Sequence, residues 1–140
     1  MSLRTNYRHT MFACYLGYIT QATVNIFAPL LFLTFQNQYH ISLEKITFLV
    51  TLNFGIQLLV DLLSAKFVDR VGIRTSILAA HLLAALGLAG LGILPELMTP
   101  YTGLLLSVCC YAMGGGLIGV LFNPIAVACP TEWKEASMSL

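Results

Sequence analysis

Charged side chains are scarce in this sequence. Of its 140 residues, seven are Lys or Arg and six are Asp or Glu. Charged residues thus make up 9% of the chain, whereas they make up about 25% of a typical soluble domain. From Thr10 to Ser42 there is no Asp, Glu, Lys or Arg at all. So few charges cannot cover a water-facing surface, so we expect lipid to surround most of the chain.

The sequence also lacks the patterns of a metal site, a nucleic-acid surface or an active site. Its four cysteines lie in or beside apolar runs without ligand spacing, which favours simple packing. His9, His40 and His81 lie in three different regions, and the basic residues form no stripe. No Ser/His pair or paired acids occur within the apolar segments. We therefore expect no enzyme, cofactor, metal or nucleic-acid partner.

Four apolar segments are each long enough to cross a bilayer, which takes about 20 helical residues. The expected spans are 11–35, 43–65, 75–94 and 101–128. Their continuous apolar character favours helices over the alternating strands of a membrane barrel. A secretory signal is the competing interpretation of the first span, but its apolar core is too long and lacks a clean cleavage site. The sequence thus predicts an all-α integral membrane protein with four transmembrane helices, antiparallel in turn because their connections are short.

Basic residues divide unevenly between the two ends of these spans. One end carries Arg4, Arg8, Lys66, Arg70, Arg74 and Lys134. The other end carries only Lys45. By the positive-inside rule, residues 1–10 and the loop 66–74 lie in the cytoplasm, which predicts a multi-pass protein of the cytoplasmic membrane. Residues 129–140 resemble the start of a fifth helix, so we expect a truncated chain.

The connection between the second and third spans holds the most specific pattern. Asp69 lies where it can cap the next helix, and Gly72 allows a backbone turn. Arg70 and Arg74 lie at the level of the lipid headgroups. An ordinary positive-inside loop has the same composition. The order and spacing of these four residues, however, resemble the conserved cytoplasmic loop of the major facilitator superfamily.

The resemblance implies a twelve-helix transporter made of two six-helix halves, of which this chain supplies the first four helices. The remaining helices of the same transporter are then an expected partner. In that superfamily the loop latches the two halves on the cytoplasmic side, which implies a gating role for the four matching residues. Ala65 and Phe67 depart from the glycine and leucine of the family pattern.

Polar side chains inside the spans repeat at helical spacing. Tyr18, Gln21 and Asn25 share one face of the first span. Asn53 and Gln57 share one face of the second. Such groups are costly in lipid and tend to face a bundle interior or a water-filled cavity. They predict either the wall of a solute cavity or hydrogen bonds that only join the helices.

The ends of the second and fourth spans add two further candidates. Asn123 precedes Pro124, which we expect to interrupt the fourth span and expose carbonyls to the same cavity. Apart from Glu44, which lies at the very start of the second span, Asp61 is the only acid within a predicted span. It is either a buried proton or cation site, or an interfacial acid that is solvated or paired with Lys66 or Arg70.

Two segments resemble the fucose-permease-like sugar branch of the superfamily. They are residues 24–29, Val-Asn-Ile-Phe-Ala-Pro, and residues 114–124, in which Gly115 and Gly119 form a face of small residues. Relatives in that branch often carry an acid where this chain has Asn25 and Gly119. Those acids are associated with proton coupling, so the resemblance does not imply sugar–proton symport here.

These patterns favour the N-terminal part of a secondary transporter that moves a small polar solute, such as a sugar, by alternating access. The expected solute-binding residues are Gln21, Asn25, Asn53, Gln57 and Asn123. Asp61 is the candidate site for a coupling proton or cation. The alternative is a self-contained four-helix protein that acts as a homodimeric small exporter or as a non-transporting scaffold. Small exporters need an acid in the first span, which this chain lacks, and a scaffold does not explain the loop pattern.

Overall fold

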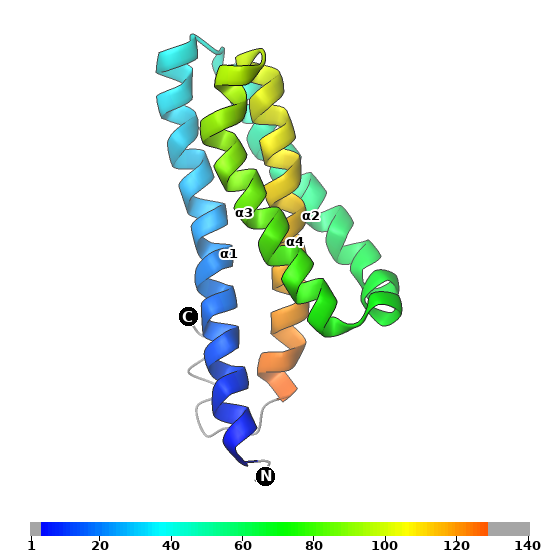
Figure 1. Cartoon of the computed structure of the whole chain (residues 1–140). Helices are drawn as coiled ribbons and strands as arrows, with labels where there is room; N and C mark the ends of the chain where they lie inside the picture. The colour runs from blue at the N-terminus through cyan, green and yellow to red at the C-terminus, as the bar shows by residue number, and fades with distance from the viewer. Residues whose placement is uncertain (1–3, 129–140) are drawn as a thin grey trace.

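The computed structural model describes residues 4–128, which form four α-helices joined by short connections (Figure 1). The helices are α1 (Arg4–Tyr39), α2 (Leu43–Val71), α3 (Ile73–Leu97) and α4 (Pro100–Ala128). Consecutive helices run in opposite directions (Figure 1). All four are long and apolar enough to cross a membrane. These four helices confirm the predicted class, an all-helical protein with four segments able to span a membrane. The predicted start of a fifth helix at 129–140 lies outside the described residues.

The connection between α2 and α3 is shorter than the predicted loop 66–74. Helix α2 continues through Val71 and α3 begins at Ile73, so Gly72 alone separates them. The Gly72 amide donates to the carbonyl of Val68 at 2.9 Å and closes the last turn of α2. Its φ of 90° lies where a side chain would clash with the backbone, so glycine suits this turn. The apolar part of α2 ends at Ser64, and the helix continues through the charged residues that follow as far as Val71.

Three prolines lie inside helices and do not break them. Pro29, Pro95 and Pro124 all lie inside helices, so α3 runs past Pro95 and α4 runs past Pro124 to Ala128. The expected interruption of the fourth span is therefore wrong. Membrane helices tolerate proline because neighbouring helices and polar side chains can satisfy the carbonyl that loses its donor.

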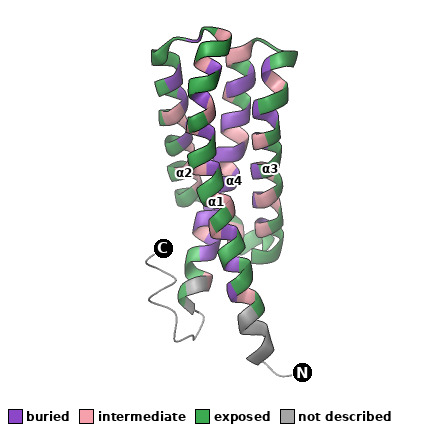
Figure 2. Cartoon of the chain, turned by 90° about the vertical axis from the view of Figure 1, so that its left-hand side faces the viewer, coloured by how far each residue is buried: buried purple, intermediate pink, exposed green. Residues whose placement is uncertain are grey.

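Helix α4 is the central helix of the bundle. It packs against α1, α2 and most extensively α3, and Figure 2 shows buried residues concentrated along it. In its apolar stretch 61% of residues are buried, against 17–28% in the other three helices. Glycines allow this burial, because Gly114 leaves room for the α3 backbone at Ala84, and Gly116 for Val60 of α2. The bundle is thus three helices arranged around α4.

The outward faces of α1, α2 and α3 are apolar and exposed. Large side chains such as Leu30, Leu62 and Leu86 are more than half exposed on these faces. Lipid or further helices therefore suit these surfaces. At the end of the bundle that includes Lys45, the ammonium of this residue lies 5.2 Å from the ring centroid of Tyr101, which ties α2 to the start of α4 by a cation–π contact.

Close packing between α3 and α4 predicts opposite outcomes for two glycine substitutions in α3. A Cβ at Gly87 would collide with the backbone of Tyr111, whereas a Cβ at Gly92 would meet no atom within 4 Å. Alanine is favoured over glycine in a helix by about 1 kcal/mol. We expect Gly87→Ala to lower the melting temperature in detergent, with a loss of about 1–3 kcal/mol from overpacking.

Gly92→Ala is the matched control and should melt at or above the wild-type temperature. A Gly87→Ala variant as stable as Gly92→Ala would contradict the helix packing described here.

Candidate functional site

Three amide side chains from α1 and α2 meet in the middle of the spans. Gln57 donates from Nε2 to Oδ1 of Asn25 at 2.8 Å and to Oδ1 of Asn53 at 3.2 Å. Asn53 is buried, and the other two are partly buried. The first bond joins α1 to α2, and the second lies within α2. We call Asn25, Asn53 and Gln57 the amide cluster.

Glycines of α4 form the wall behind the amide cluster. A Cβ added at Gly115 would lie 3.5 Å from Nε2 of Gln57 and 3.4 Å from a methyl carbon of Val24. A Cβ at Gly116 would lie 3.3 Å from Cα of Gln57. The absence of side chains on this face lets α1 and α2 approach α4 closely enough for their amides to meet.

The amide cluster uses only part of its hydrogen-bonding capacity. Each amide has two N–H donors and an acceptor oxygen. Within residues 4–128, the oxygen of Gln57 and the NH₂ groups of Asn25 and Asn53 make no hydrogen bond. None of them is completely enclosed; Asn53 as a whole is buried, whereas Asn25 and Gln57 are partly exposed. Pro29 also has no N–H to offer the backbone carbonyl of Asn25, which adds a further acceptor.

A second polar contact lies nearer the C-terminal end of α4. The hydroxyl of Tyr18 donates to Oδ1 of Asn123 at 2.7 Å and joins α1 to α4. Gln21 lies one turn further along α1, where its Nε2 is 2.5 Å from the position that a Cβ on Gly119 would take. Of the five predicted solute-binding residues, three therefore form the amide cluster and Asn123 is bonded to Tyr18 instead. Gln21 lies between these two places on α1. The sequence placed Tyr18 on this face but did not identify it as the partner of Asn123.

Asp61 lies one turn beyond Gln57 on α2 but does not belong to the amide cluster. Its side chain is exposed. In the described chain it forms no ion pair with Lys66 or Arg70. The hydroxyl of Ser64 donates to its backbone carbonyl at 2.8 Å, which leaves the carboxylate uninvolved. Asp61 thus lacks the burial expected of a proton or cation site and the pairing with Lys66 or Arg70, and its exposure is compatible with the remaining prediction, a solvated acid at the interface.

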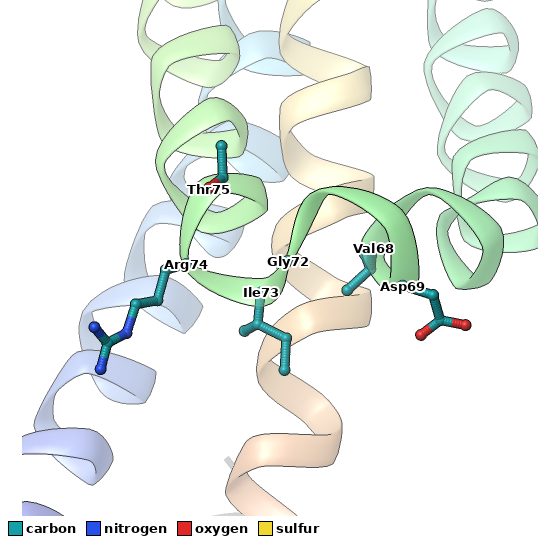
Figure 3. Close-up of a pocket in the computed structure, with 6 residues that line it drawn as sticks. All are labelled: Val68, Asp69, Gly72, Ile73, Arg74 and Thr75. Carbon is teal, nitrogen blue, oxygen red and sulfur yellow. The ribbon is translucent and has the colours of Figure 1, made fainter.

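The four residues that resemble the superfamily loop lie at the turn between α2 and α3, with Gly72 in the turn itself and the three charged residues on either side of it. Asp69 and Arg70 lie on the last turns of α2, and Arg74 lies on the first turn of α3; all three are exposed. Figure 3 shows the side chains of Asp69 and Arg74 pointing away from each other on either side of the turn. The turn borders an open hollow of about 510 Å³. Within residues 4–128 none of these charges is paired, so each can contact groups outside this segment.

Two further polar side chains inside the bundle, one buried and one partly buried, belong to none of the predicted sites. The Tyr111 side chain is fully buried, and its hydroxyl is the one buried side-chain polar atom without a hydrogen-bond partner in the described residues. His81 lies 2.9 Å from the carbonyl of Ile77 through Nδ1, and its ring meets Phe122 edge-on. Periodicity identifies faces of a helix but not which face ends up in the core. In the same residues no three His, Cys, Asp or Glu side chains gather as metal ligands.

The two tyrosines predict a pair of contrasting substitutions. A buried hydroxyl without a partner costs about 1–3 kcal/mol, so we expect Tyr111→Phe to keep or raise the melting temperature in detergent. Tyr18→Phe removes the bond to Asn123 and should lower stability by about 0.6 kcal/mol, the average for such bonds in membrane bundles. A larger loss for Tyr111→Phe than for Tyr18→Phe would show that the Tyr111 hydroxyl has a partner.

The geometry places uncharged polar groups in the middle of the spans and charged groups at the ends. Comparison of the chain with models of protein families, with curated proteins and with solved structures finds no match. The chemistry of these side chains is therefore the basis for a functional assignment.

Proposed function

We propose that this chain is the N-terminal part of a major facilitator superfamily transporter that moves a small polar solute, such as a sugar, across the cytoplasmic membrane. Its N-terminus lies in the cytoplasm, and its four helices belong to a twelve-helix fold. The observation that carries the proposal is the unused hydrogen-bonding capacity of the amide cluster. Polar groups in a span need a partner, and a solute or the water of a cavity supplies one.

The chemistry of the amide cluster favours a neutral solute with hydroxyl groups. Amides offer both donors and acceptors, and a hydroxyl can act as either. No charged side chain belongs to the cluster, so a charged solute would lack a counterion there. Asp61, one turn away, is exposed and lies outside the cluster, so it supplies no counterion there. Asn123 and Gln21 extend the polar wall along α1 and α4.

The Gly72 turn supports the larger, twelve-helix part of the proposal. A single residue joins α2 to α3, and the charges around it are exposed and unpaired within residues 4–128. Such an arrangement suits a latch that contacts another part of the transporter. The exposed apolar faces of α1 and α2 offer surfaces for further helices. Asp69, Arg70, Gly72 and Arg74 are the proposed gating residues.

Solute uptake by cells that express the natural protein tests this function. With a panel of labelled neutral sugars, we expect Gln57→Leu to reduce uptake of the transported sugar about tenfold, because a lost hydrogen bond costs up to about 1.5 kcal/mol. The matched control is Thr51→Val, because the hydroxyl of Thr51 bonds only to the Thr47 carbonyl of its own helix. Thr51→Val should transport like the wild type.

Equal uptake by Gln57→Leu and the wild type would contradict a solute-binding role for the amide cluster. A protein that accumulates no member of the panel would favour the four-helix exporter or the non-transporting scaffold. Protein abundance in the membrane, measured for each variant, separates a loss of function from a loss of folding.

A further inference from the structure

A second open hollow lies between α1, α3 and α4, away from the amide cluster. Its volume is about 450 Å³. The first turns of α1 and α3 and the last turns of α4 form it, at the end of the bundle that the basic residues assign to the cytoplasm. We call it the interfacial hollow. It is separate from the proposed solute site and depends on no transport activity.

The floor of the interfacial hollow is apolar. Ile77, Phe122 and Ile125 line it. The Phe122 ring fills the space beside Gly17, where an added Cβ would lie 2.5 Å from the ring. The same ring also meets His81 edge-on, with the centroids 6.0 Å apart. Phe122 is thus held by contacts with α1 and α3, and a ligand against this floor meets hydrocarbon.

The rim of the interfacial hollow is polar and carries positive charge. Arg74, His9 and Thr10 line it, and no Asp or Glu does. Arg74 is exposed and makes no ion pair within residues 4–128. The carboxylate of Asp69 points to the other side of the Gly72 turn (Figure 3) and does not neutralise Arg74. The guanidinium is thus available to an anion at the membrane surface.

We propose that the interfacial hollow binds an anionic phospholipid, with the phosphate at Arg74 and an acyl chain along Ile77, Phe122 and Ile125. We choose a phospholipid because the hollow combines a positively charged rim with an apolar floor. A soluble anion would use only the cationic rim. A zwitterionic lipid would reach the apolar floor, but it would bring a cationic group beside its phosphate, against the positive charge of the rim. An arginine at headgroup level beside a hydrocarbon-lined hollow fits a ligand that has both parts.

Native mass spectrometry of the full chain in detergent measures this binding. The probes are phosphatidylglycerol and phosphatidylcholine with the same acyl chains. We expect phosphatidylglycerol to bind more tightly, and Arg74→Gln to weaken it about fivefold, which corresponds to about 1 kcal/mol per basic residue at an anionic surface. Arg70→Gln is the matched control, because Arg70 is an exposed arginine that does not line the hollow. It should leave the affinity unchanged.

A second variant tests the floor. Ile125→Ser should weaken both lipids while leaving the preference for phosphatidylglycerol intact, and circular dichroism checks that each variant keeps its helices. Equal affinity for the two lipids, or equal losses in Arg74→Gln and Arg70→Gln, would overturn the proposal. Displacement of phosphatidylglycerol by inorganic phosphate at comparable concentration would also overturn it, because that result would identify a soluble-anion site.

Discussion

Close contact between the glycines of α4 and the helices around it is the constraint on which the rest of the structure depends. Lipid tails are as apolar as leucine, so membrane helices associate through tight packing and hydrogen bonds. Gly114 and Gly116 let α3 and α2 approach the α4 backbone, and Gly119 leaves room for Gln21 of α1. Helix α4 can therefore lie at the centre of the bundle while the other three keep their outer faces in lipid.

The position of the amide cluster follows from this packing. Because Gly115 has no side chain, Val24 and Gln57 both reach α4, and the faces that bear the amides turn toward each other. The bond from Gln57 to Asn25 holds α1 and α2 in this relation, while other donors and acceptors of the cluster stay unused. The amide cluster thus joins two helices and still has hydrogen-bonding groups that a polar solute could use. Charged groups, by contrast, lie at the ends of the helices, where Arg74 borders a hollow suited to lipid.

The sequence predicted those features that depend on local patterns. Long runs without charge indicated four helices, and helical spacing placed Gln21 and Asn25 on one face. The contacts between helices could not be predicted, because periodicity does not reveal which faces meet; the Tyr18–Asn123 bond and the burial of Tyr111 depend on the whole bundle. The sequence did not reveal that the connection 66–74 is mostly helical, because its charged residues are also compatible with a helix and Gly72 alone breaks it.

Whether the amide cluster faces water is the most direct test of the central claim. In a variant whose four cysteines are replaced by alanine, Gln57→Cys and Leu58→Cys place a thiol on adjacent residues of α2, one in the cluster and one on the exposed apolar face. A membrane-impermeant thiol reagent needs a hydrated, ionised thiol. We expect the reagent to label Gln57→Cys and not Leu58→Cys in native membranes. Labelling of Leu58→Cys, with Gln57→Cys inert, would contradict a water-filled cavity at these amides.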